Sequence, residues 1–472
     1  MSITVLTVFV AGELLGYGTG GALQRGIALA EYGFVLILCI VNLRLAISYF
    51  VAFTLLALGA WTFVLPDLAP GNFWGLRLAG VSVNALATAG LLAVALSTWD
   101  VRSKYRWRVE GIGFLSAFFL YSLALGLAGV ILGTVYLDNL YRDLAVFVPF
   151  VLYLPLVMLV PPDERRRILA AGLALGVVTM AASLVLGLRF EYAEGYPFLP
   201  LSSFGWLSVF GAFAAIRGLL PRAQALTLAV VMLALLLTGD VFLGAKTIAL
   251  LLVTGVWLIS GRWMWLLGAA GLAILAAVGV QGLVYSAEAT LPEGSLLASK
   301  LRQVLSLLTI VDLHFVASAR SSLGNLTGEA VTLVGYWVSH PGAALFGGGM
   351  GAGIPDLYGY LSPWAGAGGY ALEDAARNEF LRFHLPVFEI ALKAGALGVF
   401  FYLRLLHRLT VEGGAVGFLA FILLAAVLTN NKEMMLLTIL CLLVRSDLER
   451  DTEGPTVGQP ERPSAADPTM GF

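Results

Sequence analysis

The stretch AISYFVAFTLLALGAWTFVL, residues 46–65, decides the class of fold. It contains no charged side chain, and it has the length of the roughly 20-residue helix that crosses a hydrocarbon core about 30 Å thick. Across the 472 residues, 59% are hydrophobic and only 12% are charged. A soluble domain usually has about twice that charged fraction. The sequence therefore predicts an all-α integral membrane protein.

Similar apolar runs lie on both sides of this stretch, and each predicts a membrane span. We expect spans near residues 3–17, 27–42, 46–65, 75–98, 110–133, 144–161, 167–189, 204–219, 224–239, 247–260, 264–285, 387–406, 415–430 and 433–444. The shortest runs count as spans only if short helices are allowed, so the expected total is about 12–14 transmembrane helices.

Lysine and arginine residues cluster in alternate connections between the expected spans. The clusters all fall on one side, and they are Arg102, Lys104, Arg106 and Arg108, then Arg165 to Arg167, Arg222, Arg262, and Arg404 with Arg408. The positive-inside rule assigns that side to the cytoplasm. We therefore expect a multi-pass protein of the bacterial inner (plasma) membrane with both termini in the cytoplasm. The connection VYLDNLYRD (135–143) and the segment 286–386 then face outward.

The chain divides into four regions on this interpretation. Residues 1–285 form the N-terminal multi-span region, 286–386 one large extracytoplasmic loop, 387–444 the closing spans, and 445–472 a proline-rich, charged tail that is expected to be disordered. A connection of roughly 100 residues is far longer than two spans require, and such insertions are usually functional or disordered. Any chemistry is therefore expected in the loop.

The outer side carries basic residues at three places. Lys246 opens an inward span, Arg320 lies within the loop, and Arg377 with Arg382 leads up to His384. Arginine and lysine bind phosphate through charge-assisted hydrogen bonds. A histidine beside them can deprotonate an attacking hydroxyl, because its pKa lies near neutrality. These residues predict a site for a lipid-linked pyrophosphate.

A glycine run, GGGMGAG (347–353), follows His340. Glycines allow backbone amides to approach an anion closely, so Gly349 and Gly351 are candidate pyrophosphate contacts. The run could equally be a flexible turn. His340 is a further candidate, although a structural role is the simpler interpretation of this histidine.

Four pieces of sequence together resemble the superfamily of O-antigen ligases and Wzy-type O-antigen polymerases. The resemblance covers about residues 225–445, and its pieces are Lys246 at the start of a span, Arg320 in the loop, HPGAALFGGGMG from His340, and HLPVFEIALKAGALG from His384 through Gly395 to Gly398. In three places the chain departs from the family pattern. Lysine replaces the usual arginine at position 246, and the usual His-Asn pair reads His384-Leu385, with Arg377-Asn378 seven residues upstream. Lys393 stands where the family usually has an acidic residue.

The resemblance implies a GT-C-like membrane glycosyltransferase that needs neither metal nor cofactor. Such an enzyme transfers a glycan from an undecaprenyl pyrophosphate-linked donor to an acceptor hydroxyl on the outer face of the membrane. By this resemblance His384 is the general base, while Arg320 and Lys246 bind the pyrophosphate. Arg320 then belongs to the catalytic set as well as to the binding set.

Each of these residues also has a plain structural interpretation. Lys246 can be an anchor at the end of a span, Arg320 a solvated charge in the loop, and His384 an interfacial residue at the start of a helix. Glu389 and Lys393 are four residues apart and share a helix face, so pairing with each other is the default expectation. The functional alternative is that Lys393 faces the cavity and adds to the pyrophosphate site.

We favour a polymerase of lipid-linked repeat units in surface polysaccharide synthesis (O-antigen, capsule or exopolysaccharide), with another lipid-linked glycan as acceptor. A ligase that uses a lipid A core or protein acceptor, and a flippase of lipid-linked sugars, remain alternatives. A metal-dependent sugar transferase needs an acidic pair in an early outer loop, where this chain offers only Asp67, Asp138 and Asp143. Membrane lipids are expected partners, the resemblance admits a chain-length regulator, and no nucleic acid is expected.

Overall fold

The computed structural model of the protein describes residues 1–57 without 20, 71–78 without 74, 81–97, 110–161, parts of 163–230, and 322–412 without 366–369 and 384–385. This part of the chain is mostly helical. Its N-terminal half contains α1 (Ile3–Thr19), α2 (Gly21–Val41), α3 (Leu43–Leu56), α4 (Val83–Ser97), α6 (Glu110–Ile131) and α7 (Leu137–Met158).

The C-terminal half of the described chain continues with shorter elements and one long helix. These are α15 (Ser322–Ser339), α16 (Pro341–Phe346), the 3-10 turn η1 (Ser362–Trp364), α17 (Leu372–Arg377) and α18 (Pro386–Glu412). Two short antiparallel hairpins complete the set, β1 (Arg77–Leu78) with β2 (Val81–Ser82) and β3 (Phe190–Glu191) with β4 (Pro197–Phe198). The part of the expected loop that the structure describes, 322–386, therefore contains helices of its own.

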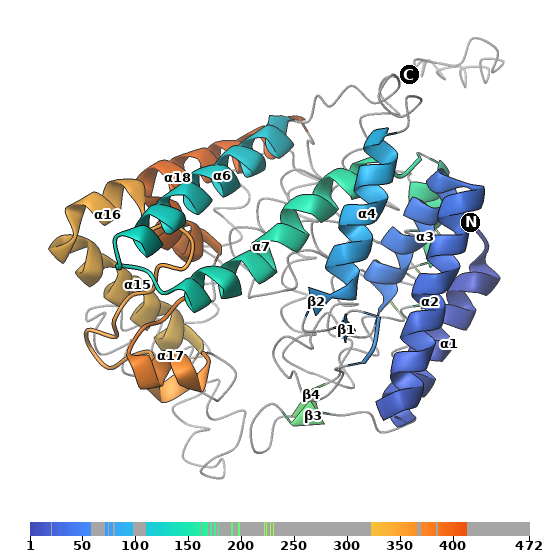
Figure 1. Ribbon diagram of the computed structural model, residues 1–472, viewed down its shortest axis with the longest axis horizontal. Coiled ribbons are helices and arrows are strands. Elements are labelled where there is room, and N and C mark those ends of the chain that lie inside the picture. The colour runs from blue at the N-terminus through green and yellow to red at the C-terminus, as the bar shows by residue number, and fades with distance from the viewer. Residues whose placement is uncertain are drawn as a thin grey trace, which may run out of the picture.

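The helices form two groups that α7 joins (Figure 1). The helices α1, α2, α3 and α4 lie together on one side, and α7 packs against α3 and α4 at one end. On the other side α6 and α18 run side by side, with α15, α16 and α17 gathered beside them. The helix α7 therefore carries the N-terminal half of the chain into the C-terminal group.

Aromatic rings fill the core of the first group. Phe9 of α1 stacks on Phe53 of α3 with ring centroids 4.1 Å apart. Phe73, from the connection between α3 and α4, meets Phe53 edge to face at 5.8 Å and stacks on Tyr32 of α2 at 4.3 Å. Such pairs add to the free energy of apolar burial. The ring contacts of Phe73 hold the connection between α3 and α4 against the helices of the first group.

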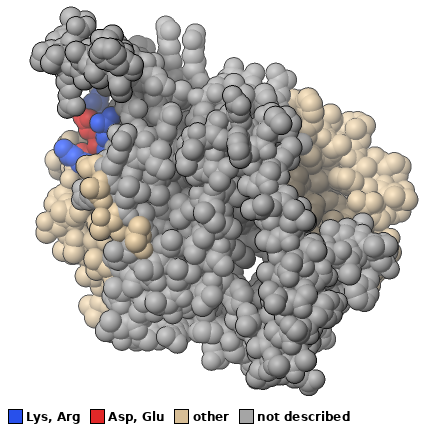
Figure 2. Space-filling model, turned by 180° about the vertical axis from the view of Figure 1, so that it is seen from behind, with Lys and Arg blue, Asp and Glu red and all other residues tan. Residues whose placement is uncertain are grey.

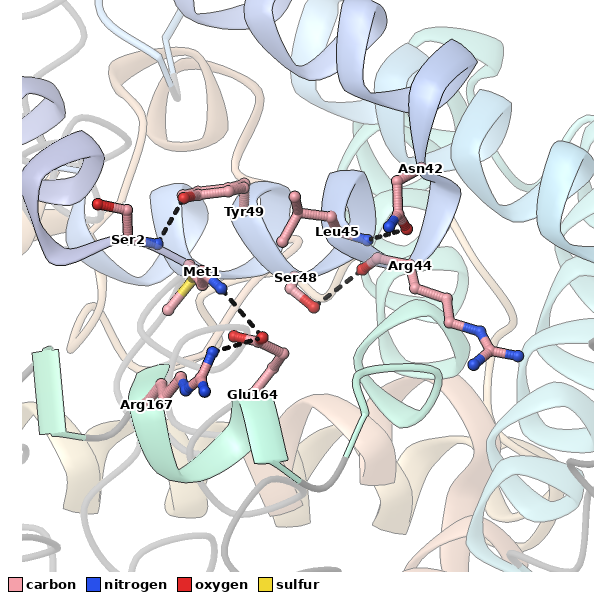
Figure 3. A network of polar contacts seen from close by, with 9 residues as sticks. All are labelled: Met1, Ser2, Asn42, Arg44, Leu45, Ser48, Tyr49, Glu164 and Arg167. Carbon is pink, nitrogen blue, oxygen red and sulfur yellow. Dashed lines mark hydrogen bonds and ion pairs between the residues drawn. The ribbon is translucent and has the colours of Figure 1, made fainter.

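Polar contacts gather at the beginning of α1 and α3 (Figure 3). The ammonium of Met1 donates to Glu164 Oε1 at 3.0 Å, and Arg167 donates to the same oxygen at 3.1 Å. Asn42 is the N-cap of α3, since its side chain accepts a hydrogen bond from the amide of Leu45 at 3.1 Å. The first residue, the connection between α2 and α3, and the segment after α7 therefore lie at one end of the helices.

The surface of these helices is strongly apolar. Large hydrophobic side chains stand exposed on α1, α2, α4 and α6, among them Ile3, Leu36, Ile40, Val94 and Ile131, whereas α3 is buried between its neighbours. Figure 2 shows the reverse face, where the described surface is mostly uncharged apart from one small group of basic and acidic side chains. Exposed apolar area of this kind is typical of surfaces that contact a partner protein or a membrane.

The described helices differ in whether they are long and apolar enough to cross a membrane. Among the described residues, α2 is long and apolar enough to cross a membrane, and shorter apolar helices cover Ile3–Gly16, Leu43–Leu56, Val83–Ser97 and Phe119–Ile131. The predicted spans near 3–17, 27–42, 110–133, 144–161 and 387–406 all fall on helix. The predicted span 75–98 differs, because its first residues form the hairpin β1–β2 and the helix begins only at Val83.

Candidate functional site

The glycine run that follows His340 has a defined backbone conformation. Gly347, Gly349 and Gly351 have φ values of 80°, 83° and 79°. Side chains with a Cβ rarely adopt this left-handed region, so every second residue of the run must be glycine. The alternation in FGGGMG therefore reflects a conformational requirement.

The same glycines allow the run to lie directly against three helices. A Cβ on Gly349 would lie 2.4 Å from the amide nitrogen of Gly126 in α6, and one on Gly351 would lie 2.7 Å from that of Leu140 in α7. A Cβ on Gly347 would lie 2.4 Å from the amide nitrogen of Ala394 in α18. We call residues 347–353 the glycine loop. At these glycines the loop lies against α6, α7 and α18 through its backbone, while the side chains of Met350 and Ala352 are buried in a cluster with Val135 and Leu140.

The helix α18 is kinked where it meets the glycine loop. Gly395 has φ 63° and ψ −162°, which are not helical values. The carbonyls of Leu392 and Lys393, one turn before the kink, accept hydrogen bonds from the amides of Gly348 (2.9 Å) and Gly349 (3.0 Å). The segments HPGAALFGGGMG and AGALG, both of which the family resemblance depends on, therefore lock together as one unit.

The amides of the glycine loop are bonded within the protein. Gly349 donates to Lys393 O, Met350 donates to Ser122 O at 2.8 Å, and Gly351 donates to Asp143 Oδ2 at 2.6 Å. An amide that already donates to a protein acceptor has no proton left for a ligand. Gly349 and Gly351 thus serve packing in this structure, and the anion that the Gly351 amide meets is the carboxylate of Asp143.

Lys393 is buried at the centre of this unit. Its ammonium lies 2.6 Å from Asp143 Oδ2 and donates to the carbonyl of Ala352 at 2.8 Å, and both charged side chains have 0% exposure. The ion pair of Lys393 is therefore with Asp143 of α7 rather than with Glu389 on its own helix. Burying two charges is costly, but removing one partner costs more because the other charge stays uncompensated.

Arginines and carboxylates continue from this buried pair toward the surface. Arg382 Nη2 lies 3.5 Å from Asp143 Oδ1 and donates to the carbonyl of Arg142 at 3.0 Å. Arg142 pairs with Asp374 at 2.7 Å, and Arg377 pairs with Asp138 at 2.5 Å. We call this set the arginine cluster. It joins one end of α7 to α17 and to the segment before α18.

Exposure rises along the arginine cluster. The side chain of Arg382 is 22% exposed and that of Arg377 is 45% exposed, while Asp138 is open to solvent as well. The Arg377 guanidinium, by its hydrogen bond, holds the pKa of Asp138 below its usual range, and the same bond raises the pKa of Arg377. Because this pair is exposed, water and salt screen it, and an incoming anion can compete for Arg377.

Glu379 lies half-buried beside the arginine cluster. Burial raises its pKa, although an interaction with Asn139 and the charges of Arg377 and Lys393 act in the opposite direction. A Cβ on Gly353 would lie 2.5 Å from Glu379 Cγ, so the glycine loop ends against this side chain. Glu379 was not among the residues that the sequence singled out, and only its position between Arg377 and Arg382 could have drawn attention to it.

The helix α15 anchors the far side of the unit. Tyr370 Oη lies 2.7 Å from Glu329 Oε1 and 2.8 Å from Asn325 Oδ1, and all three residues are buried. Burial raises the pKa of Tyr370, and the nearby Glu329 carboxylate raises it further, so the hydroxyl keeps its proton and acts as a donor. Ile354 and Phe380 pair as an antiparallel bridge in the core below.

His340 lies at the surface, and the helix α16 separates it from the glycine loop. It occupies the N-cap position of α16, its ring stacks on Tyr336 at 4.4 Å, and Nδ1 lies 3.2 Å from the carbonyl of Tyr336. The structure does not bring it into the arginine cluster. His384, Arg320 and Lys246, which sequence analysis placed at the chemical centre, lie outside the described residues.

Asp138, Arg142 and Asp143 are the residues whose importance the sequence understated. They lie in the connection VYLDNLYRD, where sequence analysis weighed the two aspartates only as metal ligands. In the structure each of the three is bonded to the C-terminal half of the chain. Within the described residues, no group of three or more His, Cys, Asp or Glu side chains is arranged to hold a metal ion.

These observations define a helical protein in which a kinked helix and a glycine loop carry a partly exposed set of arginines. No family model matches the chain, and no curated protein sequence matches it.

Proposed function

We propose that the protein is a multi-pass membrane glycosyltransferase that polymerises lipid-linked oligosaccharide repeat units. The donor is an undecaprenyl pyrophosphate-linked glycan, and the acceptor is a sugar hydroxyl of a second lipid-linked glycan. The observation that carries the proposal is the interlocking of the glycine loop with the kink at Gly395. Two sequence segments that resemble one family are far apart in the chain, yet they make a single structural unit beside a cluster of arginines.

The placement of charges supports a membrane setting. Met1, the connection before Leu43 and the segment with Glu164 and Arg167 gather at one end of the helices (Figure 3). These segments are the ones expected in the cytoplasm. The arginine cluster brings together 135–143 and 374–382, which are both expected on the outer side. Exposed apolar side chains on the intervening helices suit contact with lipid.

The proposed reaction needs a cation for the leaving group and a base for the acceptor. The acceptor hydroxyl attacks the anomeric carbon of the donor sugar, a new C–O bond forms, and the bond from that carbon to the pyrophosphate oxygen breaks. The lipid pyrophosphate leaves with the bonding electron pair. Arg377, Arg382, Arg320 and Lys246 would bind it, and His384 would take the hydroxyl proton.

Purified protein in detergent tests the proposal directly. It is supplied with undecaprenyl pyrophosphate-linked repeat units in EDTA, and the products are separated as a ladder on a gel. Wild type should give a growing ladder, and His384→Ala should bind the donor yet build no chain. The matched control is His340→Ala, which removes an exposed imidazole outside the arginine cluster and should leave the ladder intact. Unaltered chain growth by His384→Ala would exclude this residue as the base.

The acceptor separates the polymerase from the ligase and from the transporter. If wild type gives no ladder, a lipid A core acceptor is added to the same reaction. A single glycan addition to that acceptor would identify a ligase. If neither acceptor is glycosylated while donor moves across the bilayer of protein-containing vesicles, the protein is a transporter and the proposal fails.

A further inference from the structure

One carboxylate in the N-terminal half of the chain contacts the glycine loop, the helix α18 and Arg382. Oδ2 of Asp143 bonds to the Lys393 ammonium in α18 and to the Gly351 amide of the glycine loop, both at 2.6 Å. Oδ1 of the same side chain faces the Arg382 guanidinium at 3.5 Å. A single side chain thus sets the relative positions of the loop, the kinked helix and an arginine.

The two carboxylate oxygens of Asp143 face partners that differ in exposure. Lys393 and Asp143 are fully buried and form a close pair, so most of the aspartate's charge is already compensated. Arg382 lies farther off and keeps 22% of its side chain exposed. A guanidinium has five N–H donors, and among the described residues only the Arg142 carbonyl and the Asp143 carboxylate face that of Arg382, which leaves donors for an anionic ligand in this part of the structure. Asp143 can therefore orient Arg382 without occupying all of its N–H donors.

Three residues near the start of α7 contact the C-terminal half of the chain. Asp138 and Arg142 are four residues apart and share a helix face, whereas Asp143 projects about 100° farther round a helix with about 3.6 residues per turn. Each bonds to a different residue of the C-terminal half. The family resemblance covers only about residues 225–445, so it gives no role to these three residues.

We propose that Asp143 is a positioning residue of the transfer site, whose carboxylate orients Arg382 toward the pyrophosphate of the lipid-linked donor. This inference rests on the proposed function. Asp143 touches neither donor nor acceptor; it acts through Arg382. The N-terminal half then supplies a component of the donor site in addition to membrane spans.

The experiment must separate orientation of Arg382 from stability of the fold. Asp143→Asn alone leaves the Lys393 ammonium buried without a counter-charge and should lower the unfolding temperature. The double variant Asp143→Asn/Lys393→Met removes both buried charges and keeps an oxygen that accepts from the Gly351 amide, so the unfolding temperature should return toward wild type. Asp163→Asn, an exposed carboxylate at the other end of α7, is the matched control.

Binding of undecaprenyl pyrophosphate to the detergent-purified full chain is the first readout, and donor KM is the second. The stable double variant should bind this lipid about tenfold or more weakly, because a neutral amide orients a guanidinium less well than a carboxylate does. Arg382→Gln, made in wild type, should weaken lipid binding by about the same factor as the double variant does. Made in the double variant, Arg382→Gln should weaken binding little further, since both sets of changes remove the same contact of Arg382 with the lipid.

The inference is overturned if the double variant regains wild-type lipid binding together with its stability. It is also overturned if Arg382→Gln weakens binding equally in both backgrounds, or if wild type does not bind the lipid at all. A wild type that binds undecaprenyl pyrophosphate but transfers no glycan would refute the proposed function alone, because the binding comparison still tests Asp143.

Discussion

Gly349 of the glycine loop and Gly126 of α6 meet backbone to backbone. A Cβ on Gly349 would lie 2.4 Å from the Gly126 amide nitrogen, and one on Gly126 would lie 2.3 Å from the Met350 carbonyl oxygen. Gly349→Ala therefore combines an unfavourable φ of 83° with a clash against backbone that cannot move aside. We expect it to destabilise the fold by about 3 kcal/mol or more, measured by thermal unfolding in detergent.

Two other glycines provide graded controls for this prediction. Gly359 has φ 73° but open space around a Cβ, so Gly359→Ala should cost only the backbone term, about 1–2 kcal/mol. Gly342 lies in α16 with open space and without a positive φ, so Gly342→Ala should be neutral or slightly stabilising. Equal effects at all three positions would contradict the role of close packing at Gly349.

The sequence was informative about helices and less so about how they meet. Uninterrupted apolar runs predicted helices close to α1, α2, α3 and α6, because length and hydropathy are local properties. The run from residue 144 missed the start of α7, which begins at Leu137 inside the expected connection 135–143. Charge partners are not local. The i, i+4 spacing favoured a Glu389–Lys393 pair, whereas Lys393 bonds to Asp143, which is 250 residues earlier in the chain. No pattern within one helix could reveal that contact.

The glycine run shows a second kind of limit. Its composition led us to expect that its amides approach a pyrophosphate, or that the run is a flexible turn. In the structure the approach is to α6, α7 and α18, and the amides bond to protein acceptors. A sequence gives the conformational freedom of a glycine, but not which neighbour requires it. The roles of His384, Arg320 and Lys246 stay predictions.

The hydroxyl of Tyr370 provides a test of the α15 anchor. Tyr370→Phe removes a donor to the buried Glu329 carboxylate without changing the ring. We expect a loss of about 1–3 kcal/mol in the free energy of unfolding, because a buried carboxylate loses a hydrogen bond. Thermal unfolding checks the change, and Tyr141→Phe, on the exposed face of α7, is the control and should be neutral. A neutral Tyr370→Phe would show that Glu329 does not depend on this donor.

Glu379 should make the stability of the protein depend on pH. Burial raises its pKa above the usual value, so the folded state holds the proton more tightly than the unfolded state does. This contribution to stability is fully present below the unfolded pKa of about 4.3 and is lost as pH rises through the folded pKa. Glu379→Gln should raise the unfolding temperature at pH 7 by about 1–2 °C and lose that gain toward pH 4.

Unfolding scans of wild type and Glu379→Gln across this pH range provide the measurement. The exposed neighbour Glu373 supplies the comparison, since Glu373→Gln should change the unfolding temperature little at either pH. The measured quantity is the unfolding temperature of Glu379→Gln minus that of wild type at each pH. If this difference is lower at pH 7 than at pH 4, the charges of Arg377 and Lys393 outweigh burial.

Asp138 should compete with the donor for Arg377. The two side chains form an exposed ion pair at 2.5 Å, and a pyrophosphate offers the guanidinium more negative charge than one carboxylate does. Asp138→Asn should therefore lower the KM for undecaprenyl pyrophosphate-linked donor a few-fold, while the unfolding temperature stays that of wild type because exposed pairs add little stability. Arg377→Gln should raise the donor KM. If Asp138→Asn raises it as well, the intact pair is what the donor recognises, and Asp138 orients Arg377 instead of competing for it.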